Sequence, residues 1–228
     1  MVFADYSRAR AAAPPSFMNL ASKILMAPEV LTQEGLDALV SYIRSTELKD
    51  LSVFDADATN QSSAVQWVVN KKIRNTQTAP VEPFLPQLDE LFVNIIRDII
   101  NPFYGVEISG YETPQFLRYG IGGMYEPHVD GESIWMKEDG TKIWRKSVDR
   151  DLSMVLYLND DFEGGEFVFP DLGIKVTPRA GLLLCFPSSH HYRHGVMPVT
   201  KGERLAVVSW MTVKGWKTMA EEAREFEG

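Results

Sequence analysis

Cysteine is nearly absent from this 228-residue chain, and long apolar runs are missing altogether. The single Cys185 cannot form a disulfide within the chain, and its apolar neighbours at 182–186 predict a buried side chain rather than a reactive thiol. No stretch reaches the roughly 18 apolar residues of a transmembrane helix, so we expect no membrane association. Asp5, Arg8 and Arg10 interrupt the apolar run that a signal peptide requires, and we therefore expect a cytoplasmic protein.

Basic residues are also in deficit. The chain has 23 Lys and Arg against 31 Asp and Glu, and its net charge of −8 argues against general binding to nucleic acid. With 16 Gly and 13 Pro, it has too few of these residues for collagen or low-complexity disorder. A hydrophobic content of 45% is enough to form the core of one globular domain.

The residue pattern divides the chain into four segments. Residues 1–20 have no apolar period and predict a flexible arm, whereas 21–110 predict a helical region that supports the core. Residues 111–214 predict an all-β domain, and the charged tail at 215–228 predicts a short helix. In the second segment, one helix begins after the N-cap Thr32 and has an apolar stripe of Leu36, Leu39, Val40 and Ile43. We expect another helix at 86–100, ended by Asn101-Pro102.

From residue 113 the apolar period changes to two, which indicates strands. Short strands separated by turn-rich breaks are typical of a β-sandwich or a small barrel. Gly120-Ile121-Gly122-Gly123 is not a dinucleotide-binding motif, because an extended segment and not a helix follows it. We expect strands at 113–119, 125–130, 152–158, 166–169, 174–177, 182–186, 192–196 and 205–213.

The histidines of the all-β segment indicate a metal site. His128 and Asp130 are two positions apart, a spacing that puts both side chains on one face of a strand. Ten residues after His194, Arg204 begins a strand whose inward face would carry Ala206 and Val208. A buried guanidinium requires an anion to meet it. Two histidines and one carboxylate would form the facial triad of non-haem Fe(II) oxygenases, and the arginine would bind a dicarboxylate co-substrate.

Three stretches of sequence carry a resemblance to a known family. They are PQFLRYGIGGMYEPHVD, DLSMVLYLNDDFEGGEFVFP and HGVMPVTKGERLAVVSW. In order and spacing they resemble the 2-oxoglutarate- and Fe(II)-dependent dioxygenases of the prolyl 4-hydroxylase type, over roughly residues 111–214. The resemblance implies a mainly β fold with flanking helices: a double-stranded β-helix, or jelly-roll, core supported by N-terminal α-helices. It also implies Fe(II), 2-oxoglutarate and O2, with ascorbate as a candidate reductant.

The resemblance assigns roles to individual residues. Iron would be held by His128, Asp130 and His194. Arg204 would bind the far carboxylate of 2-oxoglutarate, where many collagen-type members use Lys. Tyr157 would hydrogen-bond that carboxylate, and Tyr119 would line the same pocket. His190 and His191 are alternative distal ligands, but His194 alone has the Gly-Val-x-Pro-Val continuation of the family, so we expect the other two to lie in a loop near the pocket mouth.

The sequence gives less information about the substrate than about the metal site. The segment 131–149 carries Trp and basic residues between two strands, and it would form either a loop that closes over substrate or a solvated surface hairpin. Candidates for substrate contact are Tyr125, Trp144, Arg193 and the segment 66–75. Peptidyl proline is the expected target of a prolyl 4-hydroxylase, and a free amino acid or small metabolite is the alternative. A non-catalytic jelly-roll module that senses metal or 2-oxoglutarate is the alternative from another class. The sequence does not define an oligomeric state.

Overall fold

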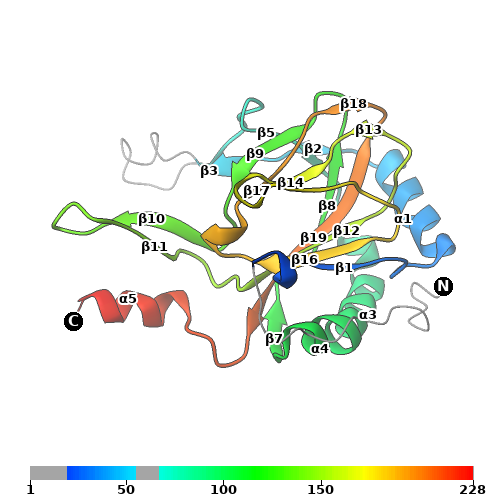
Figure 1. Cartoon of the computed structure of the whole chain (residues 1–228). Coiled ribbons are helices and arrows are strands. Elements are labelled where there is room, and N and C mark those ends of the chain that lie inside the picture. The colour runs from blue at the N-terminus through cyan, green and yellow to red at the C-terminus, as the bar shows by residue number, and fades with distance from the viewer. Residues whose placement is uncertain (1–19, 55–66, 228) are drawn as a thin grey trace.

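A computed structural model describes residues 20–54 and 67–227. The predicted arm at 1–20 therefore lies almost entirely outside the described residues. Two β-sheets face each other, and helices cover the outer face of the larger one (Figure 1). None of the described helices has the length and apolar character that crossing a bilayer would require.

The larger sheet forms the centre of the molecule. Its order is β1-β16-β12-β19-β8-β6-β2, with β7 paired to the far end of β19. Every strand pair in this sheet is antiparallel. Its strands are β1 (Leu25–Ala27), β2 (Lys49–Asp50), β6 (Gln77–Thr78), β7 (Ile108–Tyr111), β8 (Gln115–Tyr119), β12 (Leu152–Tyr157), β16 (Leu183–Pro187) and β19 (Arg204–Val213).

The smaller sheet has the order β15-β14-β17-β9-β5. Three further strand pairs lie outside the two sheets: β3 with β4, β10 with β11, and β13 with β18. The strands of the smaller sheet are β5 (Arg74–Asn75), β9 (Met124–His128), β14 (Phe167–Phe169), β15 (Ile174–Val176) and β17 (His194–Val196). The three outlying pairs comprise β3 (Val53–Phe54), β4 (Trp67–Val68), β10 (Glu132–Met136), β11 (Lys142–Lys146), β13 (Glu163–Gly164) and β18 (Val199–Lys201).

Four α-helices are described. They are α1 (Gln33–Ser45), α3 (Leu85–Ile95), α4 (Asn101–Tyr104) and α5 (Met219–Glu227). Thr32 caps α1 as predicted, because its hydroxyl accepts a hydrogen bond from the Gly35 N–H at 3.2 Å. Short helical turns of other types occur at Leu20–Lys23, Glu82–Phe84, Ile96–Ile100, Pro170–Leu172 and His190–Tyr192.

The predicted end of the second helix at Asn101-Pro102 is wrong. After α3 the chain forms a π-helical turn, Ile96–Ile100, and then continues as α4 to the left-handed cap Gly105. The Asn101 N–H bonds to the Ile96 carbonyl, five residues back. The π turn therefore resets the register just before Pro102, which occupies the first turn of α4, where a missing N–H is tolerated.

One segment differs from its prediction. The segment 21–110 is more than helical support, since β1, β2, β6 and β7 join the larger sheet and β5 joins the smaller one. For the segment 131–149 the hairpin alternative is found: it forms the β10–β11 hairpin, which projects from the body above α5 (Figure 1). The expected strands from 113 onward are confirmed, with ends shifted by at most two residues.

The apolar interior is divided by the larger sheet into two clusters. One lies between this sheet and the helices, and it includes Leu39, Phe92, Ile95 and the buried Cys185. The other lies between the two sheets and contains Tyr119, Tyr157 and Phe167 among others. Burial raises the pKa of the Cys185 thiol to about 12, so it stays protonated, as expected of a structural cysteine.

Candidate active site

His128 and His194 are brought together by the smaller sheet. β9 and β17 pair antiparallel, and their register puts His194 directly opposite His128. Opposite residues on antiparallel strands project to the same face of the sheet. The two imidazole rings consequently lie 4.4 Å apart between centroids, in the interior between the two sheets.

Asp130 completes the cluster from the end of β9. Its Oδ1 lies 3.6 Å from His128 Nε2, and its Oδ2 lies 3.4 Å from His194 Nε2. The three donor atoms all lie within 4.8 Å of one another, which is close enough for one ion. Two imidazole nitrogens and one carboxylate oxygen on one side of a metal form the facial triad of Fe(II) oxygenases.

Backbone carbonyls determine which nitrogen of each histidine faces the metal position. His128 Nδ1 lies 2.9 Å from the Glu126 carbonyl oxygen, and His194 Nδ1 lies 2.9 Å from that of Tyr192. A carbonyl can only accept, so both Nδ1 atoms carry the proton and donate it. Both Nε2 lone pairs are then free to bind an ion, as in metal-ligating histidines generally.

Protonation states also suit a metal. Burial lowers the pKa of His194 to about 4, so the imidazole is neutral near pH 7. Burial acts in the opposite direction on Asp130, but the neighbouring His194 and His128 outweigh it and hold the pKa of the carboxyl well below its ordinary value. A neutral imidazole and an ionised carboxylate are the forms that bind metal.

Ser153 orients the aspartate, and sequence analysis did not assign it this role. Its Oγ donates to Asp130 Oδ2 at 2.7 Å and lies 2.8 Å from Ser188 Oγ. Both serines are buried. Phe167 stacks on the opposite side of the cluster, 5.1 Å from the His194 ring. The sequence offered one signal for this role: Ser153 is the one small polar residue in an otherwise apolar strand, and it lies on the same face as Tyr157.

Arg204 lies in the same interior, as predicted. It begins β19 opposite Tyr119 of β8, and only 1% of its surface is exposed. Its guanidinium carbon lies 4.7 Å from the ring centre of Tyr119 and 5.0 Å from that of Tyr157. Arg204 Nε and Nη1 and the Tyr157 hydroxyl are buried without a hydrogen-bond partner among the described residues.

These unpaired donors fit a carboxylate. Leaving a buried guanidinium without an acceptor is costly, and its planar N–H fork matches a carboxylate group. Burial raises the pKa of Tyr157 to about 12, so its hydroxyl keeps its proton and can donate beside Arg204. Neither Glu203 nor Glu166 pairs with Arg204, because Glu203 contacts Arg44 and Arg118 and Glu166 contacts Lys175.

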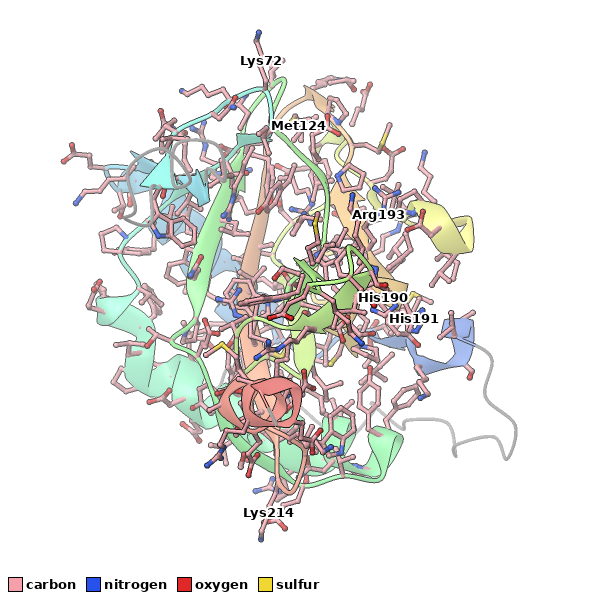
Figure 2. All side chains as sticks on the ribbon, turned by 90° about the vertical axis from the view of Figure 1, so that its left-hand side faces the viewer. Lys72, Met124, His190, His191, Arg193 and Lys214 are labelled. Atoms are coloured by element: carbon pink, nitrogen blue, oxygen red, sulfur yellow. The ribbon has the colours of Figure 1, made fainter. Side chains whose placement is uncertain are left out.

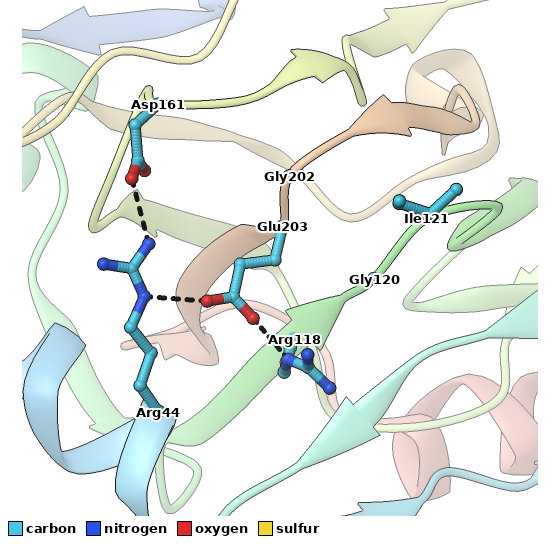
Figure 3. Close-up of a pocket in the computed structure, with 7 residues that line it drawn as sticks. All are labelled: Arg44, Arg118, Gly120, Ile121, Asp161, Gly202 and Glu203. Carbon is cyan, nitrogen blue, oxygen red and sulfur yellow. Dashed lines mark hydrogen bonds and ion pairs between the residues drawn. The ribbon is translucent and has the colours of Figure 1, made fainter.

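The contacts of Glu203 form a separate site on the outside of the barrel. Figure 3 shows a depression in which Glu203 accepts from Arg44 Nε at 2.7 Å and from Arg118 Nε at 2.5 Å, while Arg44 Nη2 reaches Asp161 at 3.0 Å. Every charge drawn there has an opposite partner. The cluster joins α1 to the residue before Arg204, so we interpret it as an anchor for the start of β19.

The residues predicted to contact substrate lie in different surroundings. The Tyr125 ring stacks on the His128 ring, with centroids 3.6 Å apart, and thus forms a wall of the metal site. Trp144, on the β10–β11 hairpin, stacks on His190 at 5.0 Å, and His190 Nδ1 also lies 2.6 Å from Glu132. Arg193 is paired with Asp171 on the surface instead of facing the triad.

His190 and His191 lie beside the hairpin, as Figure 2 shows, and neither belongs to the cluster of donor atoms. They belong to the helical turn His190–Tyr192, and their expected place near the pocket mouth stays a prediction. Of the segment 66–75, residue 66 lies outside the described residues, while Arg74 contacts the Tyr125 ring from β5.

Sequence comparison relates the chain to hydroxylases. Residues 114–212 match the model of the 2OG-Fe(II) oxygenase superfamily. The chain is 46% identical to human prolyl 3-hydroxylase 2 over 133 residues, which are 51% of this chain and 19% of that protein. It is 32% identical to chicken prolyl 4-hydroxylase subunit alpha-1 over 134 residues, 54% of this chain and 25% of the relative. The match therefore spans about a fifth to a quarter of these longer proteins.

A shorter relative and two solved structures extend the comparison. A PKHD-type hydroxylase of Klebsiella pneumoniae is 31% identical over 169 residues, 68% of this chain and 72% of that protein. The viral collagen prolyl hydroxylase of Paramecium Bursaria Chlorella virus-1 has a TM-score of 0.56 at 20% identity, over 83% of this chain and 95% of the other. A Trichoplax adhaerens prolyl hydroxylase has a TM-score of 0.58 at 16% identity, over 89% and 87%.

At these identities the structural matches establish the fold, and the predicted double-stranded β-helix is confirmed. The superfamily match and the Klebsiella relative, with the facial triad and the unpaired Arg204, show that the chain belongs to the 2OG-Fe(II) oxygenase superfamily.

Proposed function

We propose that this dioxygenase hydroxylates proline residues within a peptide or protein chain. The observation that carries the proposal is a triad of metal donors that shares its interior with the unpaired Arg204, in a chain 46% identical to a prolyl 3-hydroxylase across this region. Hydroxylation at carbon 4 is the prediction from sequence. It stays a prediction, because the relatives include both 3- and 4-hydroxylases.

The triad residues would hold iron. When bound, Fe(II) with 2-oxoglutarate and O2 supplies the oxidising power that places one oxygen atom in a C–H bond and the other in succinate. His128 and His194 would bind through Nε2, and Asp130 through its carboxylate. Ser153 would keep that carboxylate turned toward the ion by donating to it. Three protein donors leave room for a bidentate co-substrate.

Arg204 and Tyr157 would bind the far carboxylate of 2-oxoglutarate. Both present buried N–H and O–H groups that no described protein group satisfies. Their burial excludes water, which strengthens charged hydrogen bonds in this part of the interior. Tyr119 would support the guanidinium with its ring face, 4.7 Å away.

The substrate would approach past Tyr125. Its ring covers one side of His128, and its hydroxyl stays protonated because burial raises the pKa of Tyr125. Trp144 is 39% exposed and presents an aromatic surface on the hairpin next to His190. Aromatic surfaces of this kind can pack against the apolar ring of proline.

The test is mass spectrometry of candidate substrates. The protein is incubated with Fe(II), 2-oxoglutarate, O2 and ascorbate, together with proline-containing peptides, free amino acids and small metabolites. We expect a gain of about 16 Da, one oxygen atom, on a peptide. Amino-acid analysis of the product then separates 3- from 4-hydroxyproline. A gain confined to free amino acids or metabolites would select the alternative class of substrate.

Matched histidine variants test the metal centre itself. His128→Ala, Asp130→Ala and His194→Ala should each abolish tight Mn(II) binding and hydroxylation, because each removes one of three donors. His190→Ala and His191→Ala alter the neighbouring turn and should retain the metal. Retention by all five variants would contradict the metal assignment and favour a module without catalytic activity.

A further inference from the structure

A second guanidinium lies beside the metal site and has no ion-pair partner among residues 20–54 and 67–227. Arg74 is on β5, at the edge of the smaller sheet, directly opposite Tyr125 of β9. Its guanidinium carbon lies 4.7 Å from the centre of the Tyr125 ring. The same ring stacks on His128 at 3.6 Å with an interplanar angle of 20°. Because His128 covers one face of the ring, the guanidinium lies on the other face.

The charge of Arg74 is not met within the described part of the chain. No carboxylate there pairs with it, and its buried Nε has no acceptor. Asp50, the acid on the nearby β2, is already bonded to Lys71 at 2.7 Å and to Gln77 at 3.1 Å. By contrast, a carboxylate contacts each of four other arginines: Arg44, Arg118, Arg150 and Arg193.

Stacking explains only part of this arrangement. A cation over a tyrosine ring is favourable, but the contact uses the flat face of the guanidinium and leaves the buried Nε–H of Arg74 without an acceptor among the described residues. Arg204 also has buried nitrogens that lack an acceptor there, and a co-substrate carboxylate would satisfy its fork. The unpaired Nε of Arg74, beside the Tyr125 ring that stacks on His128, indicates a second ligand carboxylate.

We propose that Arg74 binds a carboxylate of the substrate and so selects an acidic group close to the target residue. This inference rests on the proposed function and specifies its substrate class. Only the Tyr125 ring separates Arg74 from the metal ligand His128. An extended peptide advances roughly 3.3–3.6 Å per residue, so the acidic residue would lie within a few residues of the target proline. Two sources share this chemistry: an Asp or Glu side chain of a peptide, and the α-carboxylate of a chain end or a free amino acid.

The position of Arg74 suits a substrate contact. Figure 2 shows Lys72 at the top of the view, at the tip of the turn that precedes β5, above Met124 of β9. Lys72 is exposed and two residues from Arg74, so it provides a matched control of equal charge.

The experiment measures the binding of fluorescent proline peptides to the Mn(II)- and 2-oxoglutarate-loaded protein by anisotropy, in addition to hydroxylation. The peptides differ only in Glu or Gln near proline, and a further pair ends in a free carboxylate or an amide. Free proline and prolinamide, which carry no label, compete for the same site. Wild-type protein should prefer one acid-containing member at least about tenfold. Arg74→Gln should abolish that preference by weakening only the acidic ligand, Arg74→Lys should keep part of it, and Lys72→Gln should keep all of it.

The outcomes separate this inference from the proposed function. The peptide pair that shows the preference identifies the carboxylate as internal or terminal. Equal loss of acidic and neutral ligands in Arg74→Gln, or no preference in wild-type protein, would overturn the role of Arg74 even if proline is hydroxylated. A charge preference that depends on Arg74 without a gain of 16 Da on any peptide would instead count against the proposed function and leave the carboxylate site standing.

Discussion

Replacing Arg204 by methionine should make the protein more stable and unable to bind 2-oxoglutarate tightly. In the structure Arg204 is 1% exposed, and two of its nitrogens lack a partner among the described residues. Apolar replacement of a buried charge at similar volume is neutral or stabilising by about 1–4 kcal/mol. For a chain of this size, a gain of 1 kcal/mol raises the melting temperature by roughly 2–4 °C.

The loss of co-substrate binding follows from the same two nitrogens. Charged hydrogen bonds contribute about 1.5–3 kcal/mol each, so loss of two should weaken 2-oxoglutarate binding by at least roughly 100-fold. Arg204→Lys should be milder, because a point charge keeps the attraction and loses the fork. Wild-type protein with the ligand at 100 times its Kd should gain about 2.7 kcal/mol of stability, and Arg204→Met should gain almost none.

Thermal unfolding with Mn(II), with and without 2-oxoglutarate, measures both effects in one assay. Arg97→Met is the control, since that arginine lies on the surface and is paired with Asp98. If 2-oxoglutarate raises the melting temperature of Arg204→Met as much as that of the wild-type protein, Arg204 does not bind the co-substrate. A large loss of stability without ligand would show instead that Arg204 is a structural residue whose charge is satisfied.

Three further changes test the surroundings of the site. Gly165→Ala should raise the KM for 2-oxoglutarate several-fold while metal binding persists. The reason is that Gly165 has φ 64° and a methyl group there would lie 3.1 Å from Arg204 Cδ. An unchanged KM would contradict this prediction. Ser153→Ala should lower Mn(II) affinity by about 10-fold, through loss of the 2.7 Å bond to Asp130, and calorimetric titration checks it. Replacing residues 134–144 by a tight turn should suppress peptide hydroxylation far more than uncoupled 2-oxoglutarate turnover; equal loss would identify the hairpin as structural.

The chemistry of the site was largely predictable because it depends on local spacing. His128 and Asp130 are two residues apart, so any strand places them on one face, and the inward direction of Arg204 follows from its alternation with Ala206. The faces of β12 were predictable for the same reason. The alternation of side chains along a strand does not depend on which strand pairs with it.

Features that depend on tertiary pairing were not accessible from the sequence. Arg74 was included only within a broad segment, since nothing local shows that β5 pairs with β9 and stacks its guanidinium on Tyr125. The three residues of β1 are too few for a recognisable alternation, and β1 is ordered by pairing with β16. Pro102 looked like a helix end because the π turn that accommodates it has no sequence pattern of its own.

The two faces of β12 have different roles: one contributes to the apolar core, and the other carries groups of the active site. Leu152, Met154 and Leu156 point into the apolar cluster under the helices, whereas Ser153 and Tyr157 point to the metal and co-substrate positions. The helical side contributes apolar burial, and the other side can therefore keep donors that no group in the described part of the chain satisfies. A slip of one residue would exchange these faces. Antiparallel pairing with β16 on one edge and β19 on the other prevents the slip, so the register of one strand positions the functional groups.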